Sequence, residues 1–311
     1  MAARQGGWTE ADVPDQSHKT AVVTGANSGL GFETSRVLFQ RGAHVIMAVR
    51  RVDAGLTAAS AITGLAAHSR LSVVELDLGN LESVRRFARA LSVHPTIDLL
   101  VNNAGIMAVP RQSTVDGFDR QLGINHLGHF ALTGHLLPQL LADGGGRVVT
   151  VSSDMHRMGQ IRFDDLQGAR RYGPWSAYGQ SKLANLYFAY ELARRARAVD
   201  ARLLSMAAHP GYAATNLQLR SARERGKAER FWRGARRFAQ SAARGALPQL
   251  RAATDPDAQT GTYYGPRRGL AGSATIVESS RRSHDENTAR RLWEVSVDLT
   301  GAGYDFSSLS W

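Results

Sequence analysis

The residues with the clearest chemical potential are Tyr178 and Lys182, which lie four positions apart in a stretch with helical periodicity. A helix places positions four apart on one face, about one turn from each other. A phenol with a reference pKa of about 10 is a poor base at neutral pH, but a neighbouring ammonium group stabilises the phenolate and lowers that pKa. The pair therefore predicts a general acid/base. Because a Tyr-x-x-x-Lys pattern also arises by chance, the alternative is a pair on a solvated helix surface.

A second source of chemistry is the pair Ser152 and Ser153, which ends the fifth apolar run of the chain. A hydroxyl at that position can polarise a substrate carbonyl or stabilise an alkoxide by hydrogen bonding. His126, His129 and His135 raise the question of a metal, since the first two can share a helical face. No third ligand stands in matching register, so we expect core or helix-cap histidines and no metal.

The stretch from Thr24 to Gly31 reads TGANSGLG and follows an apolar run. Gly25, Gly29 and Gly31 remove side chains where a backbone must turn tightly and approach a ligand, and a following helix directs its free N–H groups there. Such a strand, turn and helix suit a pyrophosphate. The spacing is G-x-x-x-G-x-G and not the commoner G-x-G-x-x-G, so a glycine-rich turn without a ligand is the alternative.

Polar residues follow three further apolar runs, and they could contact the ribose and the adenine of a dinucleotide. Arg50 and Arg51 stand where an acidic residue would hold the ribose 2′-hydroxyl of NAD, and they favour the 2′-phosphate of NADP. Two solvated arginines are the alternative. Asp77 can accept a hydrogen bond from an adenine amino group or belong to a helix N-cap. The run from Asn102 to Gly105 forms either a wall for a nucleotide or a satisfied turn.

The elements that must position these residues alternate between apolar runs typical of strands and helical stretches. That alternation predicts a parallel sheet covered by helices on both faces, and right-handed crossovers make it a single Rossmann-like, doubly wound α/β domain with seven parallel strands. Ligands of such sheets bind beyond the carboxyl ends of the strands. The expected strands are 20–24, 43–49, 71–76, 97–102, 146–152, 201–207 and 261–264, and the expected helices lie near 29–41, 52–65, 80–92, 113–141, 175–198 and 241–253.

Composition narrows the class of protein. The 311 residues include no cysteine, so disulfides and thiolate zinc sites are excluded. No apolar run approaches the roughly 18 residues of a membrane span and no secretory signal is visible, so we expect a cytoplasmic protein. The net charge of +11 raises the question of nucleic acid, but no stacking platform or groove-reading motif accompanies it, and no nucleic-acid partner is expected.

Taken together, the motifs resemble those of the short-chain dehydrogenase/reductase family along nearly the whole chain. The matching stretches are TGANSGLG, Asp77-Leu78, NNAG from Asn102, INHLGHF with Asn125, VSS ending at Ser153, YGQSK from Tyr178, and Pro210-Gly211 followed by Thr215. The serine and the tyrosine are 25 positions apart, about twice the spacing of compact members. The implied insertion at about 156–174 resembles the retinol-dehydrogenase-like branch, including bacterial relatives of the WW-domain oxidoreductases.

The resemblance implies roles for individual residues. Tyr178 would be the general acid/base, Lys182 a ribose ligand and modulator of its pKa, Ser153 the group that orients the carbonyl, and Asn125 the holder of a water for proton relay. The implied cofactor-binding residues are Gly25, Asn27, Ser28, Gly29, Leu30, Gly31, Arg50, Arg51, Asp77, Leu78, Asn103, Ala104, Gly105, Tyr178, Lys182, Pro210, Gly211 and Thr215.

The resemblance also divides the chain. An N-terminal arm covers 1–17, and the dinucleotide-binding domain covers 18–311, with a substrate lid at about 216–243 and a C-terminal extension at about 266–311. Within the lid, 220–237 carries eight Lys or Arg against two Glu. We favour a solvated amphipathic helix over an anionic-substrate clamp or a membrane-surface contact by 220–238. Our hypothesis is that three aromatic residues of the lid pack over an apolar substrate, namely Phe231, Trp232 and Phe238.

The sequence therefore predicts an NADP-dependent oxidoreductase that transfers a hydride between the nicotinamide and an alcohol, aldehyde or ketone. NADP(H) is favoured over NAD(H). The alternative is a catalytically idle dinucleotide-binding redox sensor that acts through a protein partner. Pairing of family members through the helices near 113–141 and 175–198 implies a homodimer or homotetramer.

Overall fold

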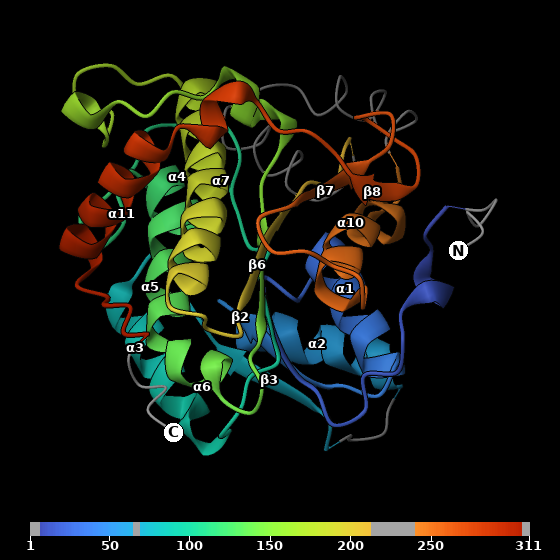
Figure 1. Cartoon of the computed structure of the whole chain (residues 1–311). Helices are drawn as coiled ribbons and strands as arrows, with labels where there is room; N and C mark the ends of the chain where they lie inside the picture. Colours follow the sequence, from blue (N-terminus) through green and yellow to red (C-terminus); the bar gives the residue numbers. More distant parts are fainter. Residues whose placement is uncertain (1–6, 65–68, 213–239, 307–311) are drawn as a thin grey trace, which may run out of the picture.

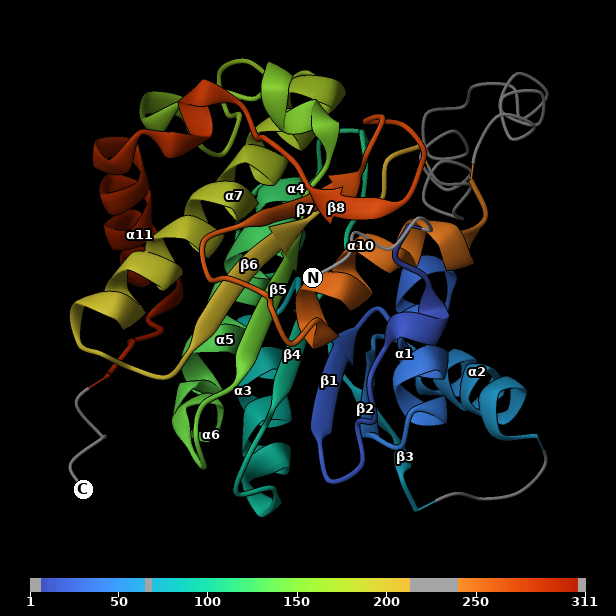
Figure 2. The same cartoon turned by 45° about the vertical axis from the view of Figure 1, so that its right-hand side comes forward.

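An eight-stranded sheet forms the centre of the computed structural model, which describes residues 7–64, 69–212 and 240–306. The strands are β1 (Thr20–Thr24), β2 (His44–Val49), β3 (Leu71–Glu75), β4 (Leu99–Asn102), β5 (Arg147–Val151), β6 (Leu204–Ala208), β7 (Tyr263–Pro266) and β8 (Ala274–Ile276). Figure 1 shows this sheet among the helices, and Figure 2 labels every strand; their order is β3-β2-β1-β4-β5-β6-β7-β8. Strands β1 to β7 run parallel, as predicted, and the chain order reverses between β1 and β4. That switch point is where such sheets bind ligands.

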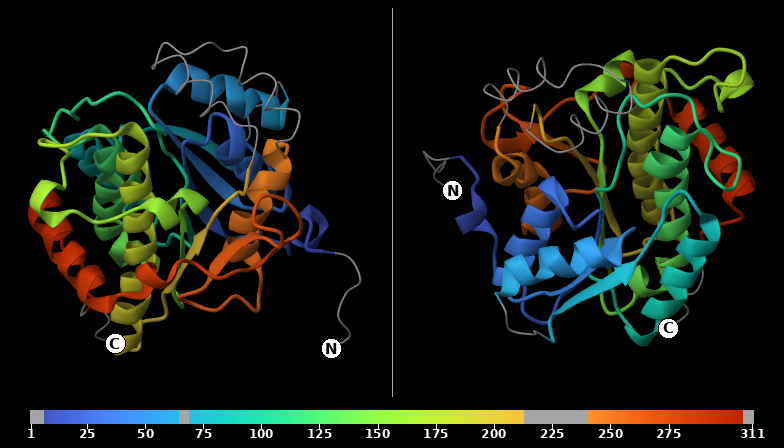
Figure 3. Two further views of the ribbon diagram at one scale, coloured as in Figure 1. Left: turned by 90° about the horizontal axis from the view of Figure 1, so that it is seen from above. Right: turned by 180° about the vertical axis from the view of Figure 1, so that it is seen from behind.

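Helices cover both faces of the sheet, as Figures 2 and 3 show. One layer contains α1 (Gly29–Gln40), α2 (Val52–Thr63) and α10 (Ala242–Thr254). The other contains α3 (Leu81–Ala90), α5 (Gly128–His135), α6 (Leu137–Leu141), the long α7 (Pro174–Ala198) and α11 (Glu286–Thr300). The alternation of side chains along a strand feeds both layers: Val22 of β1 packs with α3, α5 and α7, whereas Ala21 and Val23 pack with α1, α2 and α10. The predicted doubly wound α/β fold is confirmed.

The structure differs from the expected elements at three places. Strand β8 adds an antiparallel edge that was not expected, and α11 lies in a region that was expected only as an extension. The helix expected over 113–141 begins only at α4 (Arg120–Leu122), where the Asp119 carboxylate accepts hydrogen bonds from two backbone N–H groups and caps the helix. It then continues through a π-helical turn, η3 (Gly123–Leu127), into α5. Gly117, with φ of +86°, is incompatible with a helix and explains the late start.

The predicted insertion at 156–174 folds against α7. It consists of loops with two short 3-10 turns, η4 (Asp154–Met158) and η5 (Phe163–Asp165). The buried amide of Gln180 on α7 holds it, because Oε1 accepts from the Arg162 N–H at 3.0 Å and Nε2 donates to the Leu166 carbonyl at 3.0 Å. The insertion thus packs on the helix that carries Tyr178.

The N-terminal and C-terminal parts of the chain pack on the two helical layers. In the N-terminal arm, η1 (Glu10–Asp12) docks on α1 through an ion pair at 2.8 Å between Glu10 and Arg36. After β8, the chain makes the 3-10 turn η7 (Arg281–His284) and enters α11, which packs on α5 and α7. Trp293 of α11 stacks on Phe188 of α7 with ring centroids 5.9 Å apart. The remaining 3-10 turn, η2 (Leu91–Val93), extends α3.

Candidate active site

The glycine turn between β1 and α1 has the backbone that its sequence requires. Gly25 and Gly29 adopt φ of +66° and +58°, the left-handed region that favours glycine. Gly31 lies on the first turn of α1 beneath them, and a Cβ there would collide with the Gly25 carbonyl and lie 2.6 Å from Asn103 Nδ2. The turn therefore leaves an open cradle at the N-terminus of α1, where free N–H groups attract anions.

Asn103 locks the end of β4 to the end of β1. Its backbone N–H donates to Thr24 Oγ1 at 2.9 Å, and its side-chain amide donates to the Thr24 carbonyl at 2.8 Å. The Ala104 N–H donates to the same hydroxyl at 2.9 Å. Gln249 of α10, a residue with no recognisable motif, donates to Asn103 Oδ1 at 3.3 Å. The Asn103 side-chain amide is thus used in hydrogen bonds that fix the ends of β1 and β4. The chain around Asn103 nevertheless forms one wall of a cavity.

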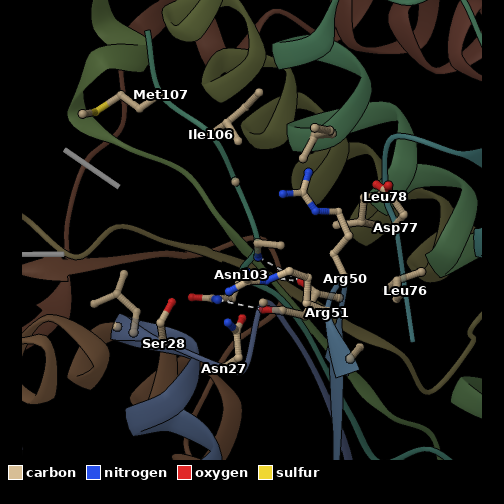
Figure 4. Close-up of a pocket in the computed structure, with 18 of the residues that line it drawn as sticks. Asn27, Ser28, Arg50, Arg51, Leu76, Asp77, Leu78, Asn103, Ile106 and Met107 are labelled. Carbon is tan, nitrogen blue, oxygen red and sulfur yellow. Dashed lines mark hydrogen bonds between the residues drawn. The ribbon is translucent and has the colours of Figure 1, made fainter. Parts of the chain in front are cut away.

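That cavity of about 480 Å³ lies beyond the carboxyl ends of the central strands (Figure 4). Thirteen of the predicted cofactor residues line it: Gly25, Asn27, Ser28, Gly29, Leu30, Arg50, Arg51, Asp77, Leu78, Asn103, Ala104, Gly105 and Lys182. Gly31, Tyr178, Pro210 and Gly211 do not belong to its lining. Apolar residues that were not predicted complete the wall, namely Ile106, Met107, Val109 and Ile124. The sequence motifs therefore converge on one concave site.

The two arginines lie at the mouth of this cavity. Both follow β2, both are exposed, and Arg51 occupies the N-cap position of α2. Within the described ranges neither guanidinium has an ion-pair partner, although surface arginines elsewhere pair with carboxylates, as Arg85 does with Glu82. Asp77, on the next strand's end, has one carboxylate oxygen occupied by the Gly79 N–H at 2.9 Å. Within the part of the chain that the structure describes, the rim thus combines two arginines that lack an ion-pair partner with one acidic side chain.

Tyr178, Lys182 and Ser153 lie together where α7 meets the end of β5. Tyr178 and Lys182 are buried on α7, and Lys182 Nζ lies 5.8 Å from the centroid of the Tyr178 ring and donates to the Val151 carbonyl at 3.0 Å. The two serines differ in their environments. The Ser152 hydroxyl donates to the Lys182 carbonyl at 2.8 Å and so joins the strand to the helix. The Ser153 hydroxyl instead faces the Tyr178 phenol and lowers its pKa.

The pKa of the phenol shifts in the direction opposite to the prediction. Burial raises the pKa of Tyr178 to about 12, and the hydrogen bond from Ser153 offsets only part of that rise. Burial also lowers the pKa of Lys182 to about 8. Both groups are fully enclosed, and desolvation disfavours the charged form of each. The expected lowering of the Tyr178 pKa by its neighbour is therefore wrong for the protein chain by itself, in which the phenol keeps its proton at neutral pH.

Asn125 lies in the π-helical turn η3 and faces the same site. Its side chain accepts from the Ile106 N–H at 2.8 Å and donates to the Ile106 carbonyl and the Ser181 hydroxyl, each at 2.9 Å. Its backbone carbonyl lies 3.1 Å from Nδ1 of His129. Since the amide is fully engaged by protein partners, the Asn125 side chain braces the cavity wall.

Pro210 and Gly211 follow β6 at the edge of the site. Gly211 has φ of +64°, and a Cβ there would lie 2.7 Å from Pro266 Cγ. Its N–H faces Nδ1 of His209 at 3.2 Å. Thr215, the basic segment 220–237, the three lid aromatics and the lid as far as residue 239 lie outside the described residues.

Histidines of the core hold the site together, which sequence spacing did not indicate. His126 and His129 are buried, as predicted, and burial lowers the pKa of each to about 3. His129 joins two motifs, because Nε2 lies 2.8 Å from the Thr24 hydroxyl and Nδ1 faces Asn125. His156 is likewise buried, directly after Ser153 in η4. A signal existed in the proximity of each histidine to a motif residue, at i+4 from Asn125 and i+3 from Ser153.

The described residues form neither a metal-binding cluster nor a membrane-spanning helix. Over 7–64, 69–212 and 240–306, no three His, Asp or Glu side chains come together in a way that could hold a metal ion. Over the same ranges, no helix combines the length and the apolar character needed to cross a membrane.

Comparison with known proteins places this geometry in context. A family model described as short chain dehydrogenase matches residues 19–226. Retinol dehydrogenase 12 of Mus musculus is 40% identical over 290 residues, which cover 92% of this chain and 88% of the relative. Polyprenol dehydrogenase of Mus musculus is 38% identical over 308 residues, covering 96% and 89% of the two chains. A crystal structure of an uncharacterized protein from Mycobacterium paratuberculosis is 47% identical, superposes with a TM-score of 0.81, and covers 96% of this chain and 100% of that one.

Proposed function

Because this chain belongs to the short-chain dehydrogenase/reductase family, in its retinol-dehydrogenase-like branch, we propose that it is an NADP-dependent oxidoreductase of apolar alcohols, aldehydes or ketones. Family membership makes it an enzyme that uses NAD or NADP to interconvert CH–OH and C=O groups. The choice of NADP and of an apolar substrate is our proposal. The observation that carries the proposal is that Tyr178 and Lys182 are buried, next to the half-buried Ser153, beside the cavity that the glycine turn opens.

The residues present fit a dinucleotide. The cradle formed by Gly25, Gly29 and Gly31, which a Cβ at Gly31 would fill, suits a pyrophosphate at the N-terminus of α1. Arg50 and Arg51 suit a 2′-phosphate, because free guanidinium groups bind phosphate oxygens in charge-assisted hydrogen bonds. Asp77 suits the adenine amino group, and Lys182 the nicotinamide ribose. Pro210, Gly211 and Thr215 stay predicted contacts for the nicotinamide end.

The chemistry assigns a task to each enclosed side chain. When bound, the nicotinamide supplies or accepts the hydride. Tyr178 gives its proton to the carbonyl oxygen during reduction and takes it back during oxidation. The Ser153 hydroxyl, which faces the phenol and lowers its pKa, orients the same oxygen. Lys182, whose pKa burial lowers to about 8, remains mostly charged at pH 7 and stabilises the phenolate left after transfer. A water on the Asn125 carbonyl is our proposed route for replacing the proton.

The apolar residues that line the cavity and the names of two similar proteins support the proposal of an apolar substrate. Ile106, Met107 and Val109 line the cavity near Lys182. Two relatives are named for alcohols, retinol and polyprenol, that are themselves hydrophobic. The hypothesis that Phe231, Trp232 and Phe238 of the lid cover the substrate stays a prediction, as do a cytoplasmic location and the solvated character of 220–238.

The oligomeric state stays a prediction, and the position of α11 limits which surfaces can pair. Pairing through the helices near 113–141 and 175–198 would give a homodimer or homotetramer. In this chain α11 packs on α5 and α7, with Trp293 5.0 Å from Phe130 and 5.9 Å from Phe188 between ring centroids. A second copy would therefore pair through the parts of that face that α11 leaves uncovered, or through α11 itself.

The test compares oxidation of NADPH by the wild type and by Tyr178→Phe on a panel of hydrophobic aldehydes and ketones. We expect turnover by the wild type and a loss of at least about a hundredfold in the variant, since proton transfer contributes that much. Tyr304→Phe is the matched control, because that buried phenol donates to the Phe130 carbonyl at 2.7 Å, away from the cavity. If both the wild type and Tyr178→Phe bind NADPH tightly and neither turns over any substrate, the redox-sensor alternative replaces the enzyme.

A further inference from the structure

His156 is a fully buried imidazole that bonds to two distant parts of the chain. Its Nδ1 lies 2.7 Å from the carbonyl oxygen of Ser153. Its Nε2 accepts a hydrogen bond at 3.0 Å from the backbone N–H of Ser280, which lies beyond β8 in the C-terminal extension. Because a backbone N–H can only donate, Nε2 must be the bare nitrogen and Nδ1 must carry the proton. The neutral ring therefore donates to Ser153 and accepts from Ser280.

The bond to Ser153 acts on the residue whose hydroxyl meets the phenol. The Ser153 carbonyl accepts a second hydrogen bond, from the His156 backbone N–H at 2.9 Å. The Ser153 hydroxyl caps the same 3-10 turn by accepting from the Met155 N–H at 3.3 Å, and it faces the Tyr178 phenol, whose pKa it lowers. The orientation of the Ser153 hydroxyl thus depends on the turn η4, and His156 is the side chain that fixes the turn's first carbonyl.

The surroundings of His156 hold the ring in this pose. The Tyr263 ring meets it edge to face, with centroids 5.7 Å apart. A Cβ on Gly179 of α7 would lie 3.0 Å from the Met155 carbonyl, so the turn packs directly against the helix, next to Tyr178. On the other side, the Arg282 guanidinium donates to the Gly159 carbonyl and ties η7 to the end of the same turn. Burial lowers the pKa of His156 to about 4, in keeping with the neutral ring.

We propose that His156 is a positioning residue for the reaction, which as the neutral Nδ1–H tautomer links the backbone of Ser153 to the C-terminal extension at Ser280. This inference rests on the proposed function, since it gives Ser153 a catalytic task. It assigns to the C-terminal extension a part in catalysis: the Ser280 N–H selects the tautomer of His156, and that tautomer holds the serine against the phenol.

Two substitutions separate the two hydrogen bonds of the ring. His156→Asn places an amide N–H where Nδ1–H stands and loses the acceptor for Ser280. His156→Gln places a carbonyl oxygen where Nε2 stands and loses the donor to Ser153. Each removes one hydrogen bond and part of the ring's volume, so a merely structural histidine would make the two variants equally impaired. We expect His156→Asn to keep kcat within about threefold of the wild type and His156→Gln to lose about tenfold or more, as for other lost groups that orient a transition state.

The measurements are kcat and KM for the carbonyl, the Kd for NADPH, and the urea midpoint of each variant. We expect the loss in kcat with an unchanged NADPH Kd, because the residues that line the cavity do not include His156. Equal kcat values for two folded variants, or kcat values that follow the urea midpoints, would overturn the inference. If His156→Gln fails to fold, the ¹⁵N spectrum of the wild-type imidazole decides: a protonated Nε2 and bare Nδ1 would overturn it. A wild type without any turnover would refute the proposed function instead, while the spectrum still reports the link.

Discussion

Acidification should destabilise this protein through buried histidines, among them His126 and His129. His126 and His129 are fully buried, and burial lowers the pKa of each to about 3. The unfolded chain has an ordinary histidine pKa of about 6.5. Between these values the unfolded state binds more protons than the folded state, so stability is complete above about pH 6.5 and is lost as the pH falls through it. From pH 7.5 to 5.5 the unfolded-state titration alone costs about 1.4 kcal/mol per histidine, or about 3 kcal/mol for the pair.

Urea unfolding at pH 7.5, 6.5 and 5.5 measures this loss as a fall in the unfolding free energy at constant m-value. His126→Phe isolates one residue, since its neighbours Phe130 and Phe188 accommodate an aromatic ring. In that variant the loss between pH 7.5 and 5.5 should be about 1.4 kcal/mol smaller than in the wild type. His18→Gln, at an exposed site just before β1, should leave the wild-type dependence intact. The same pH dependence in His126→Phe and the wild type would refute the reasoning.

Three further outcomes concern the cofactor and the acid/base pair. Gly31→Ala should weaken NADPH binding by about tenfold or more, because the new Cβ collides with the Gly25 carbonyl, whereas Gly303→Ala, which has open space around it, should not; fluorescence titration measures both. Arg50→Asp should raise the Kd for NADPH by about tenfold to a hundredfold and that for NADH by less than about threefold, as expected for a lost charge-assisted bond to phosphate; equal small changes would contradict its role. The kcat of carbonyl reduction should fall as pH rises through about 8, where Lys182 loses its charge, and Lys182→Arg should move that fall to higher pH; a flat profile to pH 9.5 in the wild type would contradict it.

The parts of the site that sequence predicts are those fixed by local spacing. Tyr178 and Lys182 share a face because four positions make about one helical turn. The glycines of the turn between β1 and α1 indicate a backbone with left-handed conformations. Twelve of the thirteen predicted cofactor residues that line the cavity, all except Lys182 of α7, follow a strand, and parallel strands end at one edge of the sheet. The direction of the Tyr178 pKa shift was mispredicted because burial depends on what packs over α7, which spacing along one helix does not contain.

The two elements that were not predicted, α11 and β8, differ in whether the nearby sequence determines them. Helix α11 had a local signature: Asp285 caps its first turn, Ala289, Leu292 and Trp293 form its buried stripe, and Gly301 ends it in a left-handed conformation. Strand β8 had none, because three residues are too few to show a period of two, and the strand exists only where β7 offers an edge. A helix can therefore be read from its own sequence where an edge strand cannot.

The chemistry of the site depends most on this C-terminal part of the chain, although no motif lies within it. The helix that carries Tyr178 and Lys182 is packed between the sheet and α11 and so is enclosed on two sides. Burial raises the pKa of Tyr178 and lowers that of Lys182. The C-terminal part of the chain also supplies the Ser280 N–H that sets the tautomer of His156. Motif residues thus provide the reactive groups, whereas the tautomer of His156 depends on a contact made more than a hundred positions further along the chain, which local spacing does not contain.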